Sequence, residues 1–140
     1  MAPQRPDSQI HRRSLVQPMT QFEITKAATF DAAHHFPNEP EGSPYRRMHG
    51  HSFQVEATVR GEALDPVHGW VADLGALDTA LKTAAARLDH GLLNDHEGLE
   101  APSLERLCLW FVAQLQPDWP GLCRITVARP TIHERCTLTL

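Results

Sequence analysis

Apolar and polar residues alternate along two stretches in the first half of the chain. The first stretch runs from Phe22 to His34 and has its apolar side chains mostly at even-numbered positions. The second covers residues 53–60, with apolar side chains at the odd-numbered positions. A period of two residues is typical of a strand that buries one face. We therefore expect two half-buried strands, joined by the proline-rich segment 37–48.

The period changes in the second half of the chain. Apolar residues at steps of three and four predict an amphipathic helix over residues 74–88. Ser103 is a suitable N-cap for a second helix, which ends before Pro117. Alternating segments at 123–127 and 136–140 predict two further strands.

The resulting order, ββααββ, predicts an α+β fold in which an antiparallel sheet of four strands carries both helices on one face. A sheet this small leaves its edges exposed, which favours assembly into a homo-oligomer. The regular pattern occupies residues 21–140, which is enough chain for one domain. Residues 1–20 show no apolar period, so we expect a disordered N-terminal tail there.

Composition narrows the classes of function. The chain carries 13 basic and 17 acidic side chains, for a formal charge of −4, which argues against a nucleic-acid partner. No apolar run approaches the roughly 20 residues of a membrane span, so we expect no membrane partner. The 3 cysteines form no CxxC pair, which fits a reducing, cytoplasmic location.

The histidines are the most unusual feature, because 9 of them occur beside a single tyrosine. His49 and His51 are spaced to point to the same face of a strand, and His34 ends the preceding strand. If these strands pair antiparallel, the 3 imidazoles converge. Three neutral imidazoles with an open fourth position form a catalytic zinc site. The spacing alone fits two solvent-facing histidines equally well, so both interpretations stay open at this point.

A second candidate for chemistry closes the first predicted helix, where Asp89 precedes His90. A carboxylate beside an imidazole fixes its tautomer and raises its basicity, which suits general acid–base catalysis. Adjacent Asp and His residues also occur often by chance. The pair alone is therefore a weak indication of an active site.

Five segments of the chain carry motifs in a recognisable order. They are Phe30-Asp-Ala-Ala-His34, Met48-His-Gly-His-Ser52, Gly69-Trp-Val-Ala-Asp73-Leu, Leu88-Asp-His-Gly-Leu-Leu-Asn94-Asp and Pro102-Ser-Leu-Glu105. Together they resemble the 6-pyruvoyl-tetrahydropterin synthase / 6-carboxy-tetrahydropterin synthase family. They occur in the family's order and near its spacing, from about Phe22 to Cys123, and are most similar to the queuosine-pathway branch.

This resemblance implies a tunnelling fold (T-fold), in which ββααββ subunits assemble into oligomeric barrels, as trimers or hexamers. It implies a zinc ion (Zn²⁺) that is held by His34, His49 and His51. In the family, the metal binds the side-chain hydroxyls of a dihydropterin and acidifies the adjacent C–H bonds. The implied small-molecule substrate is dihydroneopterin triphosphate or a related heterocycle.

The resemblance also implies roles for residues outside the histidine cluster. Asp89 and His90 match the family's proton-transfer pair, which works with a cysteine. The turn from Ser103 to Glu105 matches the segment that lines the pterin pocket.

Two positions depart from the family's pattern. The catalytic cysteine of the family lies four residues before the His-Gly-His motif, where this chain has Tyr45. A phenol with a pKa near 10 ionises far less at neutral pH than a thiol with a pKa of about 8.5. The family's pterin-anchoring glutamate corresponds to Arg129 by strand register and to Glu134 by local similarity.

Three functions remain open. The first is a zinc-dependent lyase or cyclase of this family's type. The second is a divergent member that acts on a non-pterin substrate in a specialised biosynthetic pathway, and the third is a catalytically silent, ligand-binding paralogue. The histidines together with Asp89 and His90 favour an enzyme, since a pure binder has no need for a proton-transfer pair.

Overall fold

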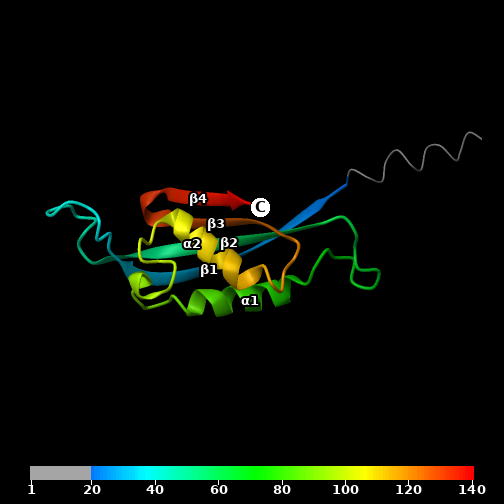
Figure 1. Cartoon of the computed structure of the whole chain (residues 1–140). Coiled ribbons are helices and arrows are strands. Elements are labelled where there is room, and N and C mark those ends of the chain that lie inside the picture. Colours follow the sequence, from blue (N-terminus) through cyan, green and yellow to red (C-terminus); the bar gives the residue numbers. More distant parts are fainter. Residues whose placement is uncertain (1–19) are drawn as a thin grey trace, which may run out of the picture.

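The computed structural model describes residues 20–140, which form one antiparallel sheet with two helices on one face (Figure 1). The predicted fold class is confirmed, whereas the expected tail lies outside the described residues except for Thr20. The strands lie in the order β1-β2-β3-β4. The elements are β1 (Phe22–His34), β2 (His49–Gly61), α1 (Leu74–Ala86), η1 (Leu93–Asp95), α2 (Leu104–Leu115), β3 (Leu122–Arg129), η2 (Pro130–Ile132) and β4 (Glu134–Thr139).

The pairing of β1 with β2 decides where the sheet carries its chemistry. Phe30 lies opposite Phe53, and their stacked rings are 5.0 Å apart. Four residues further along β1, the same ladder places His34 opposite His49. Both pairs point to the face that the helices cover, because residues at even separations share one face of a strand. The histidines therefore continue the apolar row at the end of the sheet.

Both helices begin where the sequence predicts. The Asp73 side chain accepts a hydrogen bond from the backbone N–H of Gly75 at 2.8 Å and caps α1. The Ser103 hydroxyl accepts one from the N–H of Arg106 at 3.2 Å and caps α2. Each cap satisfies a backbone donor that the helix itself leaves unpaired.

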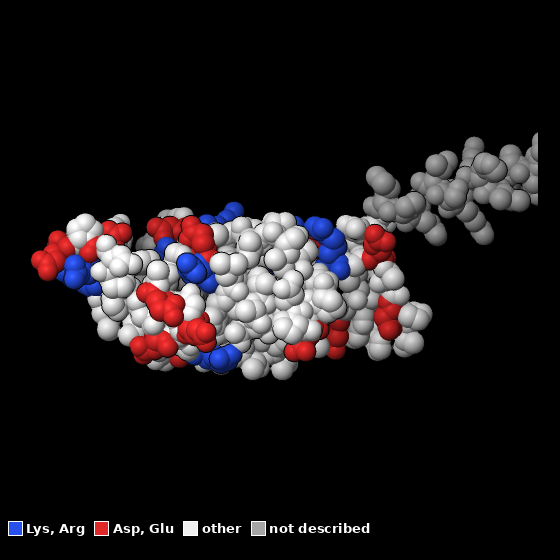
Figure 2. All heavy atoms as spheres, viewed as in Figure 1, with Lys and Arg blue, Asp and Glu red and all other residues white. Residues whose placement is uncertain are grey.

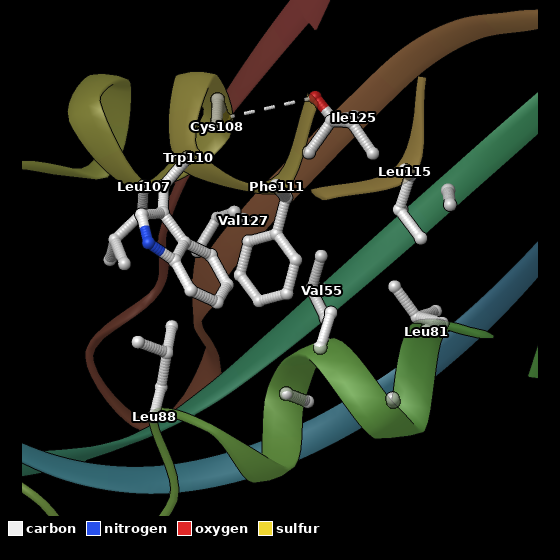
Figure 3. Close-up of a cluster of buried hydrophobic side chains, with 14 of the residues drawn as sticks. Val55, Leu81, Leu88, Leu107, Cys108, Trp110, Phe111, Leu115, Ile125 and Val127 are labelled. Atoms are coloured by element: carbon white, nitrogen blue, oxygen red, sulfur yellow. Dashed lines mark hydrogen bonds between the residues drawn. The ribbon is translucent and has the colours of Figure 1, made fainter. Parts of the chain in front are cut away.

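The core fills the space between the two helices and the sheet (Figure 3). Its members are buried apolar side chains from both helices and from β1, β2 and β3. Cys108 adds a weak contact from its thiol to the carbonyl of Ile125 at 3.8 Å. The central residues are Val55, Leu77, Leu81, Leu107, Phe111, Ile125 and Val127.

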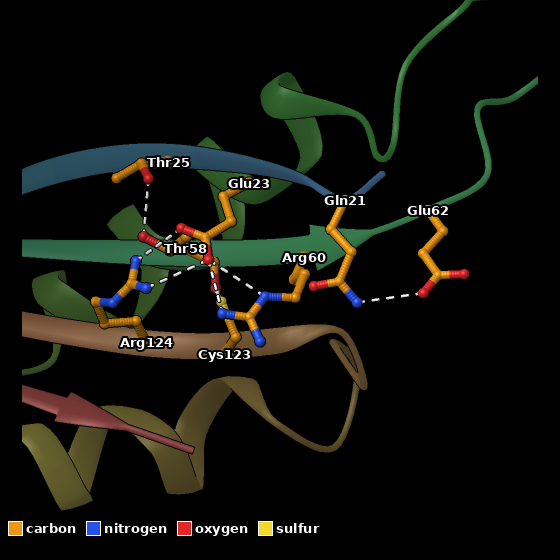
Figure 4. A network of polar contacts seen from close by, with 8 residues as sticks. All are labelled: Gln21, Glu23, Thr25, Thr58, Arg60, Glu62, Cys123 and Arg124. Carbon is orange, nitrogen blue, oxygen red and sulfur yellow. Dashed lines mark hydrogen bonds and ion pairs between the residues drawn. The ribbon is translucent and has the colours of Figure 1, made fainter. Parts of the chain in front are cut away.

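The opposite face of the sheet carries a polar network (Figure 4). The Glu23 carboxylate accepts hydrogen bonds from Arg60 at 2.7 Å and from Arg124 at 3.0 Å. The hydrogen bond from Arg124, followed by that from Arg60, lowers the pKa of Glu23 to about 2. This network joins β1, β2 and β3 across the end of the sheet that lies far from the histidines.

Charged side chains are unevenly spread over the face that carries the helices. Figure 2 shows both signs gathered towards the two ends of this face, while its centre is largely uncharged. No helix within residues 20–140 has the length and apolar character that a membrane crossing requires.

Two leucines of α2 test the packing of the core. Leu107 is fully buried, whereas Leu109 is 54% exposed. We expect Leu107→Ala to lower the free energy of unfolding by about 2–5 kcal/mol, because it leaves a cavity. Leu109→Ala is the matched control and should change it by less than about 0.5 kcal/mol. Urea denaturation measures both, and equal losses would contradict this assignment of the core.

Candidate active site

Three histidines meet at one end of the sheet. His34 ends β1, and His49 and His51 begin β2. One ring nitrogen of each lies within 4.8 Å of the others. His34 is completely buried, while the other two are partly exposed. The structure therefore brings together the three residues that the sequence proposes as metal ligands.

The distances between these imidazoles suit a metal ion. His34 Nε2 and His49 Nε2 are 3.0 Å apart. A tetrahedral zinc ion with Zn–N bonds of about 2.0–2.1 Å holds its nitrogens about 3.3 Å from each other. His49 Nδ1 donates a hydrogen bond to the carbonyl of Arg47 at 2.6 Å, which leaves the lone pair of Nε2 facing His34.

The protonation of the cluster also suits metal binding. Burial, together with the positive charges of its neighbours, lowers the pKa of His34 to about 4. The same causes hold the pKa of His51 below its ordinary value. Both rings are therefore neutral at pH 7, which is the form that ligates metals. The residues present fit a zinc ion.

Two histidines of the cluster, His49 and His51, line a pocket of about 490 Å³, and the buried His34 lies behind them. This volume falls in the range of small-molecule sites. Tyr45 lies in the pocket wall with 60% of its surface exposed, and its carbonyl accepts a hydrogen bond from the N–H of Phe36 at 2.8 Å. The lining residues are Phe36, Glu39, Pro44, Tyr45, His49, His51, Arg129, Ile132 and Glu134.

Arg129 and Glu134 both lie in this pocket, although the sequence presents them as alternatives for one position. Arg129 ends β3, Glu134 begins β4, and the two residues are opposite each other in the ladder. Arg129 Nε is 2.9 Å from Glu134 Oε2. A guanidinium and a carboxylate therefore both lie where the family resemblance predicts a single pterin-anchoring residue.

Asp89 and His90 lie beside β1, outside the pocket of Tyr45. The His90 N–H donates to the carbonyl of Asp31 at 2.6 Å, and the Ala33 N–H donates to the carbonyl of Gly91 at 2.9 Å. His90 has a φ of 57°, in the left-handed region. These bonds hold the segment after α1 against the edge of β1.

The Asp89 carboxylate orients His90. Its Oδ2 accepts a hydrogen bond from His90 Nδ1 at 2.8 Å, and its Oδ1 accepts one from the N–H of Asp31 at 2.9 Å. The hydrogen bond to Asp89 raises the pKa of His90. The N–H of Asp31, followed by the His90 side chain, lowers the pKa of Asp89.

His90 and Tyr45 line different pockets among the described residues. His90 lines a second pocket with Ser52 and the backbone of β2, and His51 borders both pockets. Ser103 and Glu105 line neither of them. Ser103 acts as the cap of α2, and its predicted contact with a pterin stays a prediction, as does that of Glu105.

Two further residues at the candidate site were not predicted from the sequence. Glu39 lines the pocket from the proline-rich loop, where no period marks it. Asn94 accepts from the N–H of His35 at 3.1 Å and donates to its carbonyl at 2.8 Å. This clamp fixes the backbone directly after His34, and the Leu-Leu-Asn-Asp segment was the only signal for it.

The four-stranded sheet, the two helices on one face and the converging imidazoles define a T-fold subunit with a candidate metal centre. A family model described as 6-pyruvoyl tetrahydropterin synthase matches residues 23–139. The chain belongs to the 6-pyruvoyl tetrahydropterin synthase family.

Named relatives agree with this assignment. The chain is 37% identical over 119 residues to a 6-carboxy-5,6,7,8-tetrahydropterin synthase of Synechocystis, covering 81% of this chain and 87% of the relative. It is 32% identical over 98 residues to a dihydroneopterin monophosphate aldolase of Pyrococcus furiosus, covering 70% and 78%.

Solved structures share the fold. The 6-pyruvoyl tetrahydropterin synthase of Caenorhabditis elegans superimposes with a TM-score of 0.74 at 22% identity, covering 87% of this chain and 97% of that one. A Plasmodium vivax 6-pyruvoyltetrahydropterin synthase, in which a glutamate described as the catalytic residue is mutated, gives a TM-score of 0.65 at 18% identity, covering 85% and 97%.

Metal analysis tests the histidine cluster. We expect the purified protein to bind about one zinc ion per chain and His49→Ala to lose it, because a coordinating imidazole is removed. Zinc at 100 times its Kd should raise the free energy of unfolding by about 2.7 kcal/mol in every protein that keeps the site and not in His49→Ala. His68→Ala is the control, since His68 lies outside the cluster. Equal zinc content in both variants would refute the assignment.

Titration of His90 tests its pairing with Asp89. We expect a pKa above the ordinary value of about 6.5, and Asp89→Asn should lower it towards that value. The pair stabilises the fold fully below about pH 6.5, and this contribution is lost as the pH rises through the higher native pKa. Histidine NMR measures the shift, with the His68 signal as internal control. An unchanged His90 pKa in Asp89→Asn would contradict the pairing.

Proposed function

We propose that the chain is a zinc-dependent lyase of the 6-pyruvoyl/6-carboxy-tetrahydropterin synthase type, acting on a phosphorylated dihydropterin. One observation carries the proposal: three imidazoles converge beside a pocket large enough for a small heterocycle, and two of them, His49 and His51, line its wall. The names of the relatives, which include a synthase and a dihydroneopterin monophosphate aldolase, support the substrate class.

His34, His49 and His51 would hold the zinc ion and leave its fourth position open towards the pocket. When bound, zinc polarises the oxygen atoms of a substrate and acidifies the neighbouring C–H bonds. The chain itself orients these ligands through the Arg47 carbonyl and through the burial of His34.

Asp89 and His90 would move a proton at the substrate side chain. Asp89 holds the Nδ1 proton of His90, so His90 Nε2 is the atom that exchanges a proton. The raised pKa of His90 keeps a larger share of the ring protonated near neutral pH, which suits a general acid. His51, which borders both pockets, is the link between this pair and the metal side.

The second proton-transfer group is Tyr45 or Glu39, since both line the histidine pocket. Tyr45 stands where the family resemblance places a cysteine, so its phenol would take over the role of the thiol. Glu39 offers a carboxylate, which is a second type of side chain that serves in general acid–base catalysis. The catalytic glutamate of the Plasmodium vivax relative favours keeping Glu39 as the alternative base.

We also propose that the protein works as a homo-oligomer. β1 and β4 are the two edge strands of the described sheet. Large apolar side chains, Phe22, Leu64 and Trp70 among them, are exposed at the end of the molecule where β2 finishes. Open edges beside an apolar patch favour pairing with further copies of the chain.

Turnover tests the function and separates the two candidate bases. The zinc-loaded protein should consume dihydroneopterin triphosphate or monophosphate. Chromatography with mass detection measures the loss of the substrate and the formation of the product. We expect Tyr45→Phe to lower kcat by about 10²–10⁴-fold with zinc still bound, as the loss of a general acid–base group predicts.

Glu39→Gln is the matched variant, and His68→Ala is the control with unchanged activity. If Glu39→Gln loses turnover while Tyr45→Phe keeps it, Glu39 is the base and the proposed role of Tyr45 in proton transfer is wrong. If the zinc-loaded protein consumes neither dihydroneopterin phosphate, the proposed substrate class is wrong.

A further inference from the structure

Arg129 is the one guanidinium in the wall of the histidine pocket. Only 15% of its side chain is exposed, although arginine is almost never buried without a partner. Its Nε lies 2.9 Å from Glu134 Oε2, yet Nε makes no well-directed hydrogen bond within the described residues. The pair is therefore an ion contact that leaves a buried donor unsatisfied, and such a donor is costly without an acceptor.

The charges around the pocket show which kind of ligand would supply this acceptor. Its wall holds Glu39 and Glu134 against Arg129, for a formal charge of −1. A divalent ion at the three histidines changes this sum to +1. Glu134 is 48% exposed, in contrast to 15% for Arg129, so the carboxylate lies nearer the solvent and the guanidinium deeper.

We propose that Arg129 binds an anionic oxygen group of the substrate, a carboxylate or a phosphate, within the histidine pocket. The proposal rests on the proposed function for the identity of the substrate as a pterin. A guanidinium offers a planar fork of donors that matches such groups, and it has no acceptor for the N–H groups of a heterocycle.

The Glu134 carboxylate contacts Nε of this fork without a well-directed hydrogen bond. An oxyanion that displaces Glu134 from the guanidinium can supply a better-directed acceptor. Arg129 is thus a specificity-determining residue that selects substrates by charge, and Glu134 competes with the ligand for it. Anion binding should strengthen when Glu134 loses its charge.

Small anions test the proposal without a pterin. The cobalt-substituted protein should show a change in its visible spectrum on titration with acetate or inorganic phosphate. Arg129→Gln should weaken binding at least about tenfold, as expected for the loss of a charge-assisted hydrogen bond. Arg135→Gln is the matched control, because Arg135 is exposed and does not line the pocket.

The comparison of the two anions identifies the preferred group. Glu134→Gln should tighten binding of that anion by up to about fivefold, since the competing Glu134 carboxylate is half exposed and its ion contact is therefore weak. This second variant keeps the test decisive if Arg129→Gln does not fold, which circular dichroism reports. Equal affinities in the unmodified protein, Arg129→Gln and Arg135→Gln would overturn the proposal, and so would weaker anion binding in Glu134→Gln.

A pterin pair separates this inference from the proposed function. The zinc-loaded protein should bind pterin-6-carboxylate at least about tenfold more tightly than 6-hydroxymethylpterin, and Arg129→Gln should abolish the preference. If both pterins bind equally, the proposed role of Arg129 in anion binding is wrong, while the proposed function on a pterin substrate is unaffected. If neither binds but acetate or phosphate still depends on Arg129, the inference stands and the pterin substrate is wrong.

Discussion

The antiparallel register of β1 and β2 is the constraint on which both the core and the candidate site depend. It stacks Phe30 on Phe53 inside the core and, along the same ladder, places His34 opposite His49. A slip by one residue would turn every side chain of a strand to the other face. Such a slip would expose the phenylalanines and separate the imidazoles at once. Selection for a packed core therefore also maintains the geometry of the histidine cluster.

The remaining groups reach the site through short connections that are themselves held by hydrogen bonds. The segment after α1 is bonded to β1 on both sides of His90, and Asn94 clamps the backbone at His35. At the other strand pair, His133 adopts a φ of 60° and closes the turn that sets Arg129 against Glu134. Backbone contacts thus position the residues of the candidate site. Less conformational entropy is therefore lost when a ligand binds.

The strands and helices could be predicted from the sequence, because their apolar residues recur with a regular period. The placement of residues in turns and loops could not be predicted, because no period marks it. The alternation from Phe22 to His34 predicted the strand, and Ser103 marked the start of a helix. The spacing of His49 and His51, with antiparallel pairing assumed, predicted that the histidines converge. The joint presence of Arg129 and Glu134 in one pocket depends on the turn between β3 and β4, which no period encodes. The separation of His90 from Tyr45 is likewise a property of tertiary placement, because both residues lie outside regular elements.

The two departures from the family's motif pattern lie at positions where a substitution disturbs the packing of this fold least. Tyr45 belongs to the loop between β1 and β2, and Arg129 is the last residue of β3. Neither position contributes to the apolar row that fixes the register, so their side chains can vary while the histidines stay in place. In the function that we propose, the three histidines and the Asp89–His90 pair would supply chemistry that many related substrates require, whereas Tyr45 and Arg129 would contact the groups that distinguish one substrate from another. Divergence in this chain is therefore expected first in substrate selection, with the means of activating the substrate retained.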